Sequence, residues 1–318
     1  MKKALITVGK ILLVILILII LSLTVLFIYH RIMLSKEEEL LKDYPGQIVE
    51  VNGHKMNVLV EGEGEHTFVF LSGAGNSSPA LSFKPLCSRL NDGYRTVVIE
   101  KFGYGISDIV DTERDYKVMV DECREALSKA GVQAPYILCP HSKSGLDTLI
   151  WAQCYPDEVE AIVGLDMAFP KSYEGMDFEN RDNSTALTDI AKNTGIIRPF
   201  LTDASLPDIY TKDEKALIRA ITVRKYNNKV FINEIPTIPA ALELINSNEK
   251  PVCPTLLLLS AGDGTGMDTG TWRGYAYDYA KGMDNITTAE FGCSHIEIVY
   301  NEADEVAGRM KELAESLG

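Results

Sequence analysis

The stretch LCPHSKSGL, residues 138–146, joins an apolar strand-like segment to an apolar-faced helical segment and contains two serines. A sharp strand-to-helix turn that presents a nucleophilic serine needs compact residues two positions before and two positions after it. For Ser142 these positions hold Pro140 and Ser144, which are both compact. For Ser144 one of them would be Leu146, which is bulky. The stretch therefore predicts Ser142 as a nucleophile and Ser144 as its small neighbour.

The competing interpretation of this stretch is an ordinary junction in which a serine merely caps the helix. A serine hydroxyl is a weak nucleophile, so a catalytic reading needs a base and an acid that orients the base. Of the five histidines, His295 in FGCSHIEIV lies in a loop after a predicted strand and before the last predicted helix. His295 is therefore the predicted base. The other four histidines lie elsewhere: His30 follows the first apolar run, His54 is in the predicted hairpin, His66 begins a strand and His141 precedes the candidate serine.

Two aspartates compete for the role of the orienting acid. Asp263 follows LLLLSAG and Asp166 stands in GLDMAFP, so both come directly after a predicted strand. Sheets of parallel strands place their ligand chemistry at these carboxyl ends. Asp263 is favoured because its strand leads towards the loop of His295. Asp166 stays as the alternative, and either could be a turn aspartate that bonds its own backbone.

Backbone N–H groups that could stabilise an oxyanion are predicted at two positions. One belongs to Lys143, directly after the candidate serine. The other belongs to Ala74 in SGAG, where neighbouring glycines allow a close backbone approach after the apolar strand FVFL. The Lys143 side chain is expected to be solvated, although a cation there could favour acidic substrates.

Short apolar segments alternate with amphipathic helical segments through most of the chain, which predicts βαβ units and a mostly parallel sheet. Asn52-Gly53 between alternating apolar residues predicts a hairpin at the start. Between about 171 and 250 the strand signal fades and helical segments take over, which predicts a cap insertion. The predicted strands cover 47–51, 55–61, 67–71, 95–100, 136–140, 159–165, 254–260 and 285–291, and the main helices 116–130, 145–155, 213–225, 270–281 and the segment from 303.

Residues 11–29 form an apolar run without a charge, long enough to cross a bilayer core. The run lacks the small-residue cleavage site of a secretory signal, so residues 1–34 are predicted to be an uncleaved anchor with a basic flank. A cleaved signal is the alternative. Residues 35–45, SKEEELLKDYP, are predicted to be a charged linker, and the domain proper spans 46–318.

Basic residues lie on both sides of the apolar run, so its orientation is nearly balanced. The free amino terminus favours an inside N-terminus and an extracellular catalytic domain on the cell membrane. Six cysteines without metal-site spacing argue the other way, because free thiols suit a reducing compartment. After Leu34 the chain carries 45 acidic against 27 basic residues, a formal charge of −18. This charge would repel nucleic acid.

The segments FLSGAGNSSPALSFKPL, EKFGYGISD, LCPHSKSGLDTLIWAQCYPDEVEAIVGLDMAFP, PTLLLLSAGD and GCSHIEIV together resemble the α/β-hydrolase superfamily, from about Gly46 to the end. The chain is most similar to bacterial membrane-anchored or exported members with a PHSxSG elbow. The resemblance implies an eight-stranded, mostly parallel sheet flanked by helices. Three positions depart from the usual pattern: Ser72 replaces a common histidine, Pro140 and Ser144 replace glycines, and Lys143 replaces an apolar or amide residue.

By this resemblance Ser142, Asp263 and His295 form a catalytic triad, with oxyanion N–H groups from Ala74 and Lys143. The expected activity is that of a membrane-anchored serine hydrolase, cleaving a small-molecule ester or amide through an acyl-enzyme without cofactor or metal. An aminopeptidase-like peptidase on the same fold is the alternative within enzymes. A non-catalytic surface binding module is the alternative of another class. Substrate and oligomeric state are not indicated by the sequence.

Overall fold

The computed structural model describes residues 2–178 and 184–318, and the chain divides into two compact units. One unit joins Met1–Tyr44 to Asp182–Tyr226. The other joins Pro45–Arg181 to Asn227–Gly318 and contains every strand of the sheet. All candidate site residues belong to this second unit, which is therefore described first.

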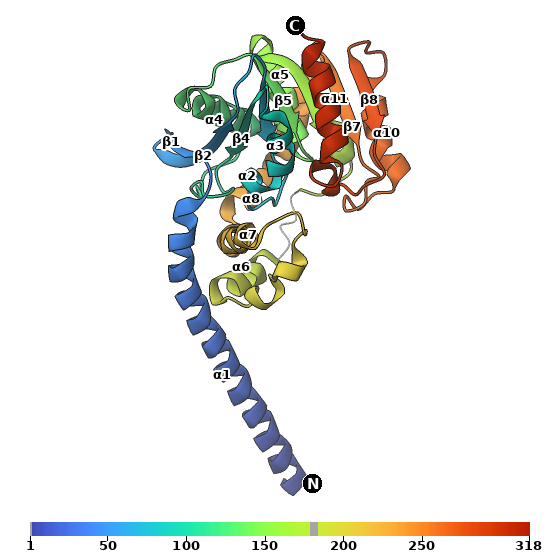
Figure 1. Cartoon of the computed structure of the whole chain (residues 1–318). Helices are drawn as coiled ribbons and strands as arrows, with labels where there is room; N and C mark the ends of the chain where they lie inside the picture. Colours follow the sequence, from blue (N-terminus) through green and yellow to red (C-terminus); the bar gives the residue numbers. More distant parts are fainter. Residues whose placement is uncertain (1, 179–183) are drawn as a thin grey trace. The chain divides into compact units, whose positions relative to one another are not determined.

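The second unit is built on one eight-stranded sheet with the order β1-β2-β4-β3-β5-β6-β7-β8 (Figure 1). Strands β1 and β2 pair antiparallel, β2 pairs antiparallel with β4, and every pairing from β4 to β8 is parallel. The predicted mostly parallel α/β-hydrolase sheet is confirmed. The strands are β1 Gln47–Val51, β2 His54–Glu61, β3 Thr67–Leu71, β4 Arg95–Glu100, β5 Tyr136–Pro140, β6 Val159–Leu165, β7 Thr255–Leu259 and β8 Ile286–Glu290.

The first hairpin forms where the sequence predicts it. Asn52 and Gly53 both have positive φ, 51° and 78°, which is the backbone twist that a tight two-residue β-turn needs. Register follows from this turn, since Val51 pairs with His54. The central strands β3, β5 and β7 are buried along their whole length, as expected for parallel strands covered on both faces.

Helices cover both faces of the sheet and bury two separate apolar clusters (Figure 1). One cluster lies under α4 Tyr116–Lys129, α5 Ser144–Cys154 and α9 Ile238–Ser247. The other lies under α3 Lys84–Leu90 and α11 Ala303–Glu315. This three-layer arrangement fixes the carboxyl ends of β5, β6 and β7, from which the candidate site residues extend. The remaining helices of this unit are α2 Pro79–Ser82, α8 Lys229–Glu234 and α10 Thr269–Ala280.

The range 171–250, predicted to be a cap insertion, is divided between the two units. Residues 182–226 group with the N-terminal segment, and they contain α6 Ser184–Thr194 and α7 Lys212–Lys225, while the rest of the range groups with the sheet. Helix α9 instead buries Ile238, Ala241 and Ile245 in the core beside α5. An amphipathic sequence predicts a buried face but does not show which core that face joins.

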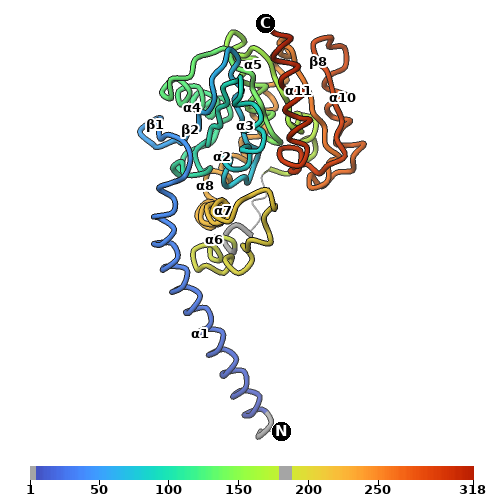
Figure 2. Tube along the Cα trace, viewed as in Figure 1, coloured from blue at the N-terminus to red at the C-terminus, as the bar shows by residue number. Residues whose placement is uncertain are grey.

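The N-terminal helix α1 runs without interruption over Lys2–Leu40 (Figure 2). Its apolar side chains from Leu5 to Tyr29 are mostly exposed, and the helix is long and apolar enough to cross a membrane. The predicted charged linker 35–45 is corrected, because α1 continues through residue 40 and a short 3₁₀ turn occupies Leu41–Asp43.

Glu37 near the end of α1 is buried against two arginines of the same unit. Its carboxylate accepts hydrogen bonds from Arg198 at 2.6 and 3.0 Å and from Arg224 at 2.7 Å. Burial opposes the charge of Glu37, but the two guanidinium groups outweigh that effect and lower its pKa. The end of α1 therefore packs within the first unit.

Candidate active site

Ser142 occupies the turn between β5 and α5 with a φ of 56°. A non-glycine residue in this left-handed region is strained, and such strain persists only where the surrounding structure holds it. The turn is held at both sides, because the Ser142 carbonyl accepts hydrogen bonds from Gly145 N at 3.0 Å and Ala168 N at 2.8 Å. The predicted strand-to-helix turn is therefore present, with Ser142 at its strained position.

The space around Ser142 requires small neighbours. A Cβ on Gly145 would lie 2.2 Å from the Ala168 carbonyl oxygen, and a Cβ on Gly73 would lie 2.5 Å from Ser142 Cβ. Ser144 is fully buried, and its hydroxyl donates to the carbonyls of Leu71 at 2.6 Å and His141 at 2.8 Å. Ser144 therefore supports the turn, as predicted, while Ser142 keeps its hydroxyl for other contacts.

His295 lies in the loop after β8 and faces Asp166 at the end of β6. His295 Nδ1 and Asp166 Oδ2 are 2.5 Å apart, and both residues are buried. A carboxylate can only accept here, so Nδ1 carries the proton and Nε2 is free to act as a base. The imidazole ring stacks on that of His141, the residue directly before Ser142, with ring centroids 4.6 Å apart. His295 is thus brought beside the strained turn with its base nitrogen available.

Asp166 is held by four donors that converge on its carboxylate. Oδ1 accepts from Ser260 N at 2.8 Å and Trp272 Nε1 at 2.9 Å, while Oδ2 accepts from Ser260 Oγ at 2.5 Å besides His295. Burial favours the neutral acid, but the hydrogen bonds from His295, Ser260 and Trp272 outweigh burial and lower the pKa of Asp166. The carboxylate therefore stays ionised, which suits it to stabilise an imidazolium.

Asp263, the preferred acid from the sequence, does not occupy this place. Its side chain is exposed, and its contact with His295 runs through the backbone, from His295 N to the Asp263 carbonyl at 2.9 Å. The strand β7 does lead to the histidine loop, as expected, but its contribution is main-chain support. The alternative, Asp166, has the buried carboxylate that meets the imidazole.

His141 supports the histidine loop from the other side. Its Nε2 lies 3.0 Å from the His295 carbonyl oxygen, and because a carbonyl only accepts, Nε2 carries a proton. Burial, and then repulsion by His295, lower the pKa of His141 to about 4. The ring therefore remains neutral at ordinary pH and does not compete with His295 for a proton.

The stability of the fold is expected to fall between pH 6.5 and pH 4 because of His141. In this window the unfolded chain protonates His141 while the folded protein does not, so stability rises with pH by up to about 1.4 kcal/mol per unit. Urea unfolding at several pH values should show this slope in the wild type and a shallower one in His141→Gln. The matched control His54→Gln, at an exposed histidine, should keep the wild-type slope, and equal slopes in all three proteins would contradict the assignment.

The Lys143 side chain is buried, so the expectation that it is solvated is wrong. Its ammonium forms an ion pair with Glu234 on α8 and lies 3.3 Å from the Tyr116 hydroxyl. Burial opposes the charge on Lys143, but Glu234 and then Asp147 outweigh it, and its pKa is raised. A second buried pair, Lys101 and Asp147 at 2.9 Å, lies in the same region. The Lys143 side chain thereby ties the turn of Ser142 to α8.

Breaking this buried pair should destabilise the fold strongly. Glu234→Gln leaves the Lys143 ammonium buried without its carboxylate, and removal of one partner of a buried pair costs about 3–5 kcal/mol. The exposed pair Lys229–Asp111, whose lysine is on the same helix α8, is the control: Asp111→Asn should change the free energy of unfolding little, because water screens an exposed ion pair. Denaturant unfolding measures both, and equal losses would refute the buried role.

The predicted oxyanion donors flank Ser142. Lys143 follows it in the turn, and the loop of Ser72, Gly73 and Ala74 lies against it through the close approach of Gly73. The Ser72 hydroxyl is buried and has no hydrogen-bond partner within the described residues. Two backbone segments that could donate N–H hydrogen bonds, Lys143 and the loop of Ala74, therefore lie beside Ser142.

Sequence reasoning missed three supporting side chains: Ser260, Trp272 and the hydrogen-bonding role of His141. Ser260 stands within LLLLSAGD and could have been noticed as the first polar residue after β7. Trp272 lies in α10 and gives no local signal, since its partner Asp166 is 106 residues away. In residues 2–178 and 184–318, no group of three His, Cys, Asp or Glu side chains could hold a metal ion.

The chain has the α/β-hydrolase fold and belongs to the same family as the uncharacterized protein YbdG of Bacillus subtilis. This chain is 37% identical to YbdG over 253 residues, covering 74% of this chain and 75% of that one. It is also 28% identical over 118 residues to the 2-(acetamidomethylene)succinate hydrolase of Mesorhizobium japonicum, covering 37% of this chain and 41% of that one.

Solved structures share the fold at low identity. The epoxide hydrolase VrEH1 of Vigna radiata superposes with a TM-score of 0.68 at 18% identity, covering 86% of this chain and 99% of that one. The enol-lactonase of Burkholderia xenovorans superposes with a TM-score of 0.59 at 16% identity, covering 85% and 100%. No family model matches the chain.

Proposed function

We propose that the protein is a serine hydrolase that cleaves an ester or small amide bond through an acyl-enzyme. The observation that carries the proposal is the buried contact of His295 with Asp166, stacked beside the strained turn of Ser142. A strained non-glycine residue costs stability and is typical of catalytic sites, and so is a buried carboxylate whose pKa is shifted by a histidine partner. A binding module would need neither feature.

The reaction would begin with attack of Ser142 Oγ on the substrate carbonyl carbon, while His295 Nε2 takes the hydroxyl proton. Asp166 keeps the proton on Nδ1 and stabilises the imidazolium that forms. Collapse of the tetrahedral intermediate breaks the bond to the leaving group, which receives the proton from Nε2. Water, activated by the same imidazole, then releases the acid and restores the serine.

The oxyanion of the intermediate would be stabilised by the N–H groups of Lys143 and Ala74. Two observations support this pairing: Lys143 follows the strained serine, and Gly73 brings its loop within contact of Ser142. The buried Lys143 side chain holds this part of the backbone in place through Glu234. Donors fixed in this way need no reorganisation when charge develops.

The bond type is supported by two relatives. One is named a 2-(acetamidomethylene)succinate hydrolase and another an enol-lactonase, and both names denote hydrolysis. The acyl-transfer chemistry of the Ser142 site suits such carbonyl substrates.

Mass spectrometry after treatment with a fluorophosphonate tests the proposal directly. Trypsin releases residues 130–143, AGVQAPYILCPHSK, in which Ser142 is the only serine, whereas Ser144 begins the next peptide. We expect the phosphonate on the first peptide alone, and Ser142→Ala should remove it. Folded protein that stays unlabelled, or that carries the label on the peptide starting at Ser144, would refute the proposed nucleophile.

We further propose that α1 is retained as an uncleaved anchor, with an extracellular catalytic domain at the cell membrane. The support is the burial of Glu37 between Arg198 and Arg224. Cleavage beyond residue 37 would remove the carboxylate that pairs with the partly buried Arg198 and Arg224. Intact mass of the membrane-extracted protein should include residues 1–34. Protease accessibility on whole cells tests the orientation, and a mature protein that begins after residue 34 would contradict the anchor.

A further inference from the structure

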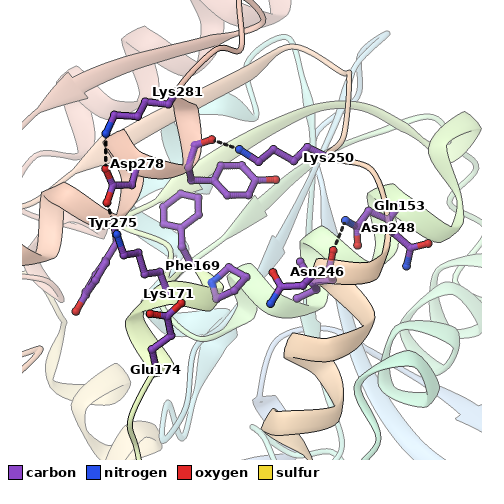
Figure 3. Close-up of a pocket in the computed structure, with 13 residues that line it drawn as sticks. Gln153, Phe169, Lys171, Glu174, Asn246, Asn248, Lys250, Tyr275, Asp278 and Lys281 are labelled. Atoms are coloured by element: carbon purple, nitrogen blue, oxygen red, sulfur yellow. Dashed lines mark hydrogen bonds and ion pairs between the residues drawn. The ribbon is translucent and has the colours of Figure 1, made fainter.

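A pocket of about 550 Å³ opens on the sheet-bearing unit, apart from the residues of the serine site (Figure 3). Its volume is in the range of small-molecule sites. The walls are apolar where Phe169 and Tyr279 pack with ring centroids 4.8 Å apart, and Pro170 and Ile245 extend this surface. The pocket therefore suits a ligand with an apolar or aromatic body.

Positive charges outnumber negative charges around the pocket. The Asp278 carboxylate forms ion pairs with two ammonium groups, Lys171 at 2.5 Å and Lys281 at 3.0 Å (Figure 3). Lys171 and then Lys281 lower the pKa of Asp278 to about 2, so this carboxylate is ionised and neutralised. With Glu174 exposed at the rim and Lys250 included, the lining carries one net positive charge in a chain of net charge −14.

Lys250 supplies the cation without a carboxylate partner in the part of the chain that the structure describes. Its ammonium donates to the Tyr279 carbonyl at 2.6 Å and lies 4.6 Å from the centre of the Tyr279 ring. An ammonium has three donors, so two remain for a ligand. The backbone bond and the ring contact hold these donors at the pocket.

We propose that this pocket is an accessory binding site for a small monocarboxylate with an aromatic or aliphatic body. The carboxylate accepts hydrogen bonds from the Lys250 ammonium, and the body lies on Phe169 and the Tyr279 ring. The site is independent of the serine chemistry, although its walls adjoin the machinery around Asp166. Phe169 follows Asp166 by three residues, and α10 carries both Tyr279 and Trp272.

Calorimetric titration of the full chain in lipid nanodiscs tests the site with three probes that share one body: 4-phenylbutyrate, 4-phenylbutan-1-ol and 4-phenylbutylamine. Empty nanodiscs correct for partition into lipid. We expect the carboxylate to bind at least about tenfold more tightly than the alcohol, because hydrogen bonds to a charged group are the stronger kind. The amine should bind most weakly. Equal affinity for the alcohol, or tighter binding of the amine, would overturn the assignment of a carboxylate.

One variant locates the binding. Lys250→Gln keeps most of the pocket surface, and it should weaken 4-phenylbutyrate binding about tenfold while changing alcohol binding little. Lys55→Gln, at an exposed lysine on β2, is the matched control and should bind like the wild type. Thermal unfolding confirms that each variant is folded. Unchanged carboxylate affinity in folded Lys250→Gln would show that the carboxylate binds elsewhere and would refute the site.

Discussion

Replacing Ser142 by alanine should lower ester turnover by about 10⁵-fold, since loss of the nucleophile in a serine triad removes most of the catalysis and leaves only binding and oxyanion stabilisation. The fold should be unaffected or slightly stabilised. Alanine has the same difficulty with a φ of 56° as serine, but within the described residues the hydroxyl of the partly buried Ser142 has no hydrogen bond to lose. Initial rates with a chromogenic ester, together with thermal unfolding, measure both effects.

The matched variant is Ser144→Ala, two residues along the same turn. Ser144 is buried and its hydroxyl donates to two carbonyls, so its removal should lower stability by about 1–3 kcal/mol. Turnover by the folded fraction should stay within about tenfold of the wild type. The reverse outcome, a large loss of turnover in Ser144→Ala and a small one in Ser142→Ala, would exchange the roles of the two serines.

The sheet could be predicted from the sequence because its signals are local. A buried parallel strand is recognised by a short run of apolar residues, and the dipeptide Asn52-Gly53 by itself predicts the turn of the first hairpin. The turn of Ser142 could also be predicted, because the two small residues that it needs, Pro140 and Ser144, lie only two positions away in the sequence. Each of these features depends on side chains within a few positions of one another.

The parts that could not be predicted depend on distant partners. Asp166 and Asp263 both follow strands, and only the donors Ser260 and Trp272, 94 and 106 residues beyond Asp166, distinguish them. Burial of Lys143 depends on Glu234, which lies 91 residues later on a helix that the sequence assigns to the cap. A local sequence pattern does not show which of several distant groups will form the ion pair or hydrogen bond with a buried charged side chain.

Asp166→Asn should reduce turnover by about 10⁴-fold. The reason is that the hydrogen-bond donors around residue 166 fix the orientation of the new side-chain amide. Oδ1 accepts from two obligate donors, Ser260 N and Trp272 Nε1, so the oxygen of an asparagine must keep that place. The amide nitrogen is then forced to face His295 Nδ1 and to donate to it. His295 would carry its proton on Nε2 and could no longer accept one from Ser142.

The control is Asp263→Asn, which exchanges an exposed carboxylate for an amide and leaves the backbone bond from His295 N intact. Its turnover should remain within about twofold of the wild type. Nitrogen NMR of the His295 ring distinguishes the mechanism from simple disruption, because Asp166→Asn should move the proton from Nδ1 to Nε2 in a folded protein. Loss of turnover in Asp263→Asn with retention in Asp166→Asn would instead place the acid at the end of β7.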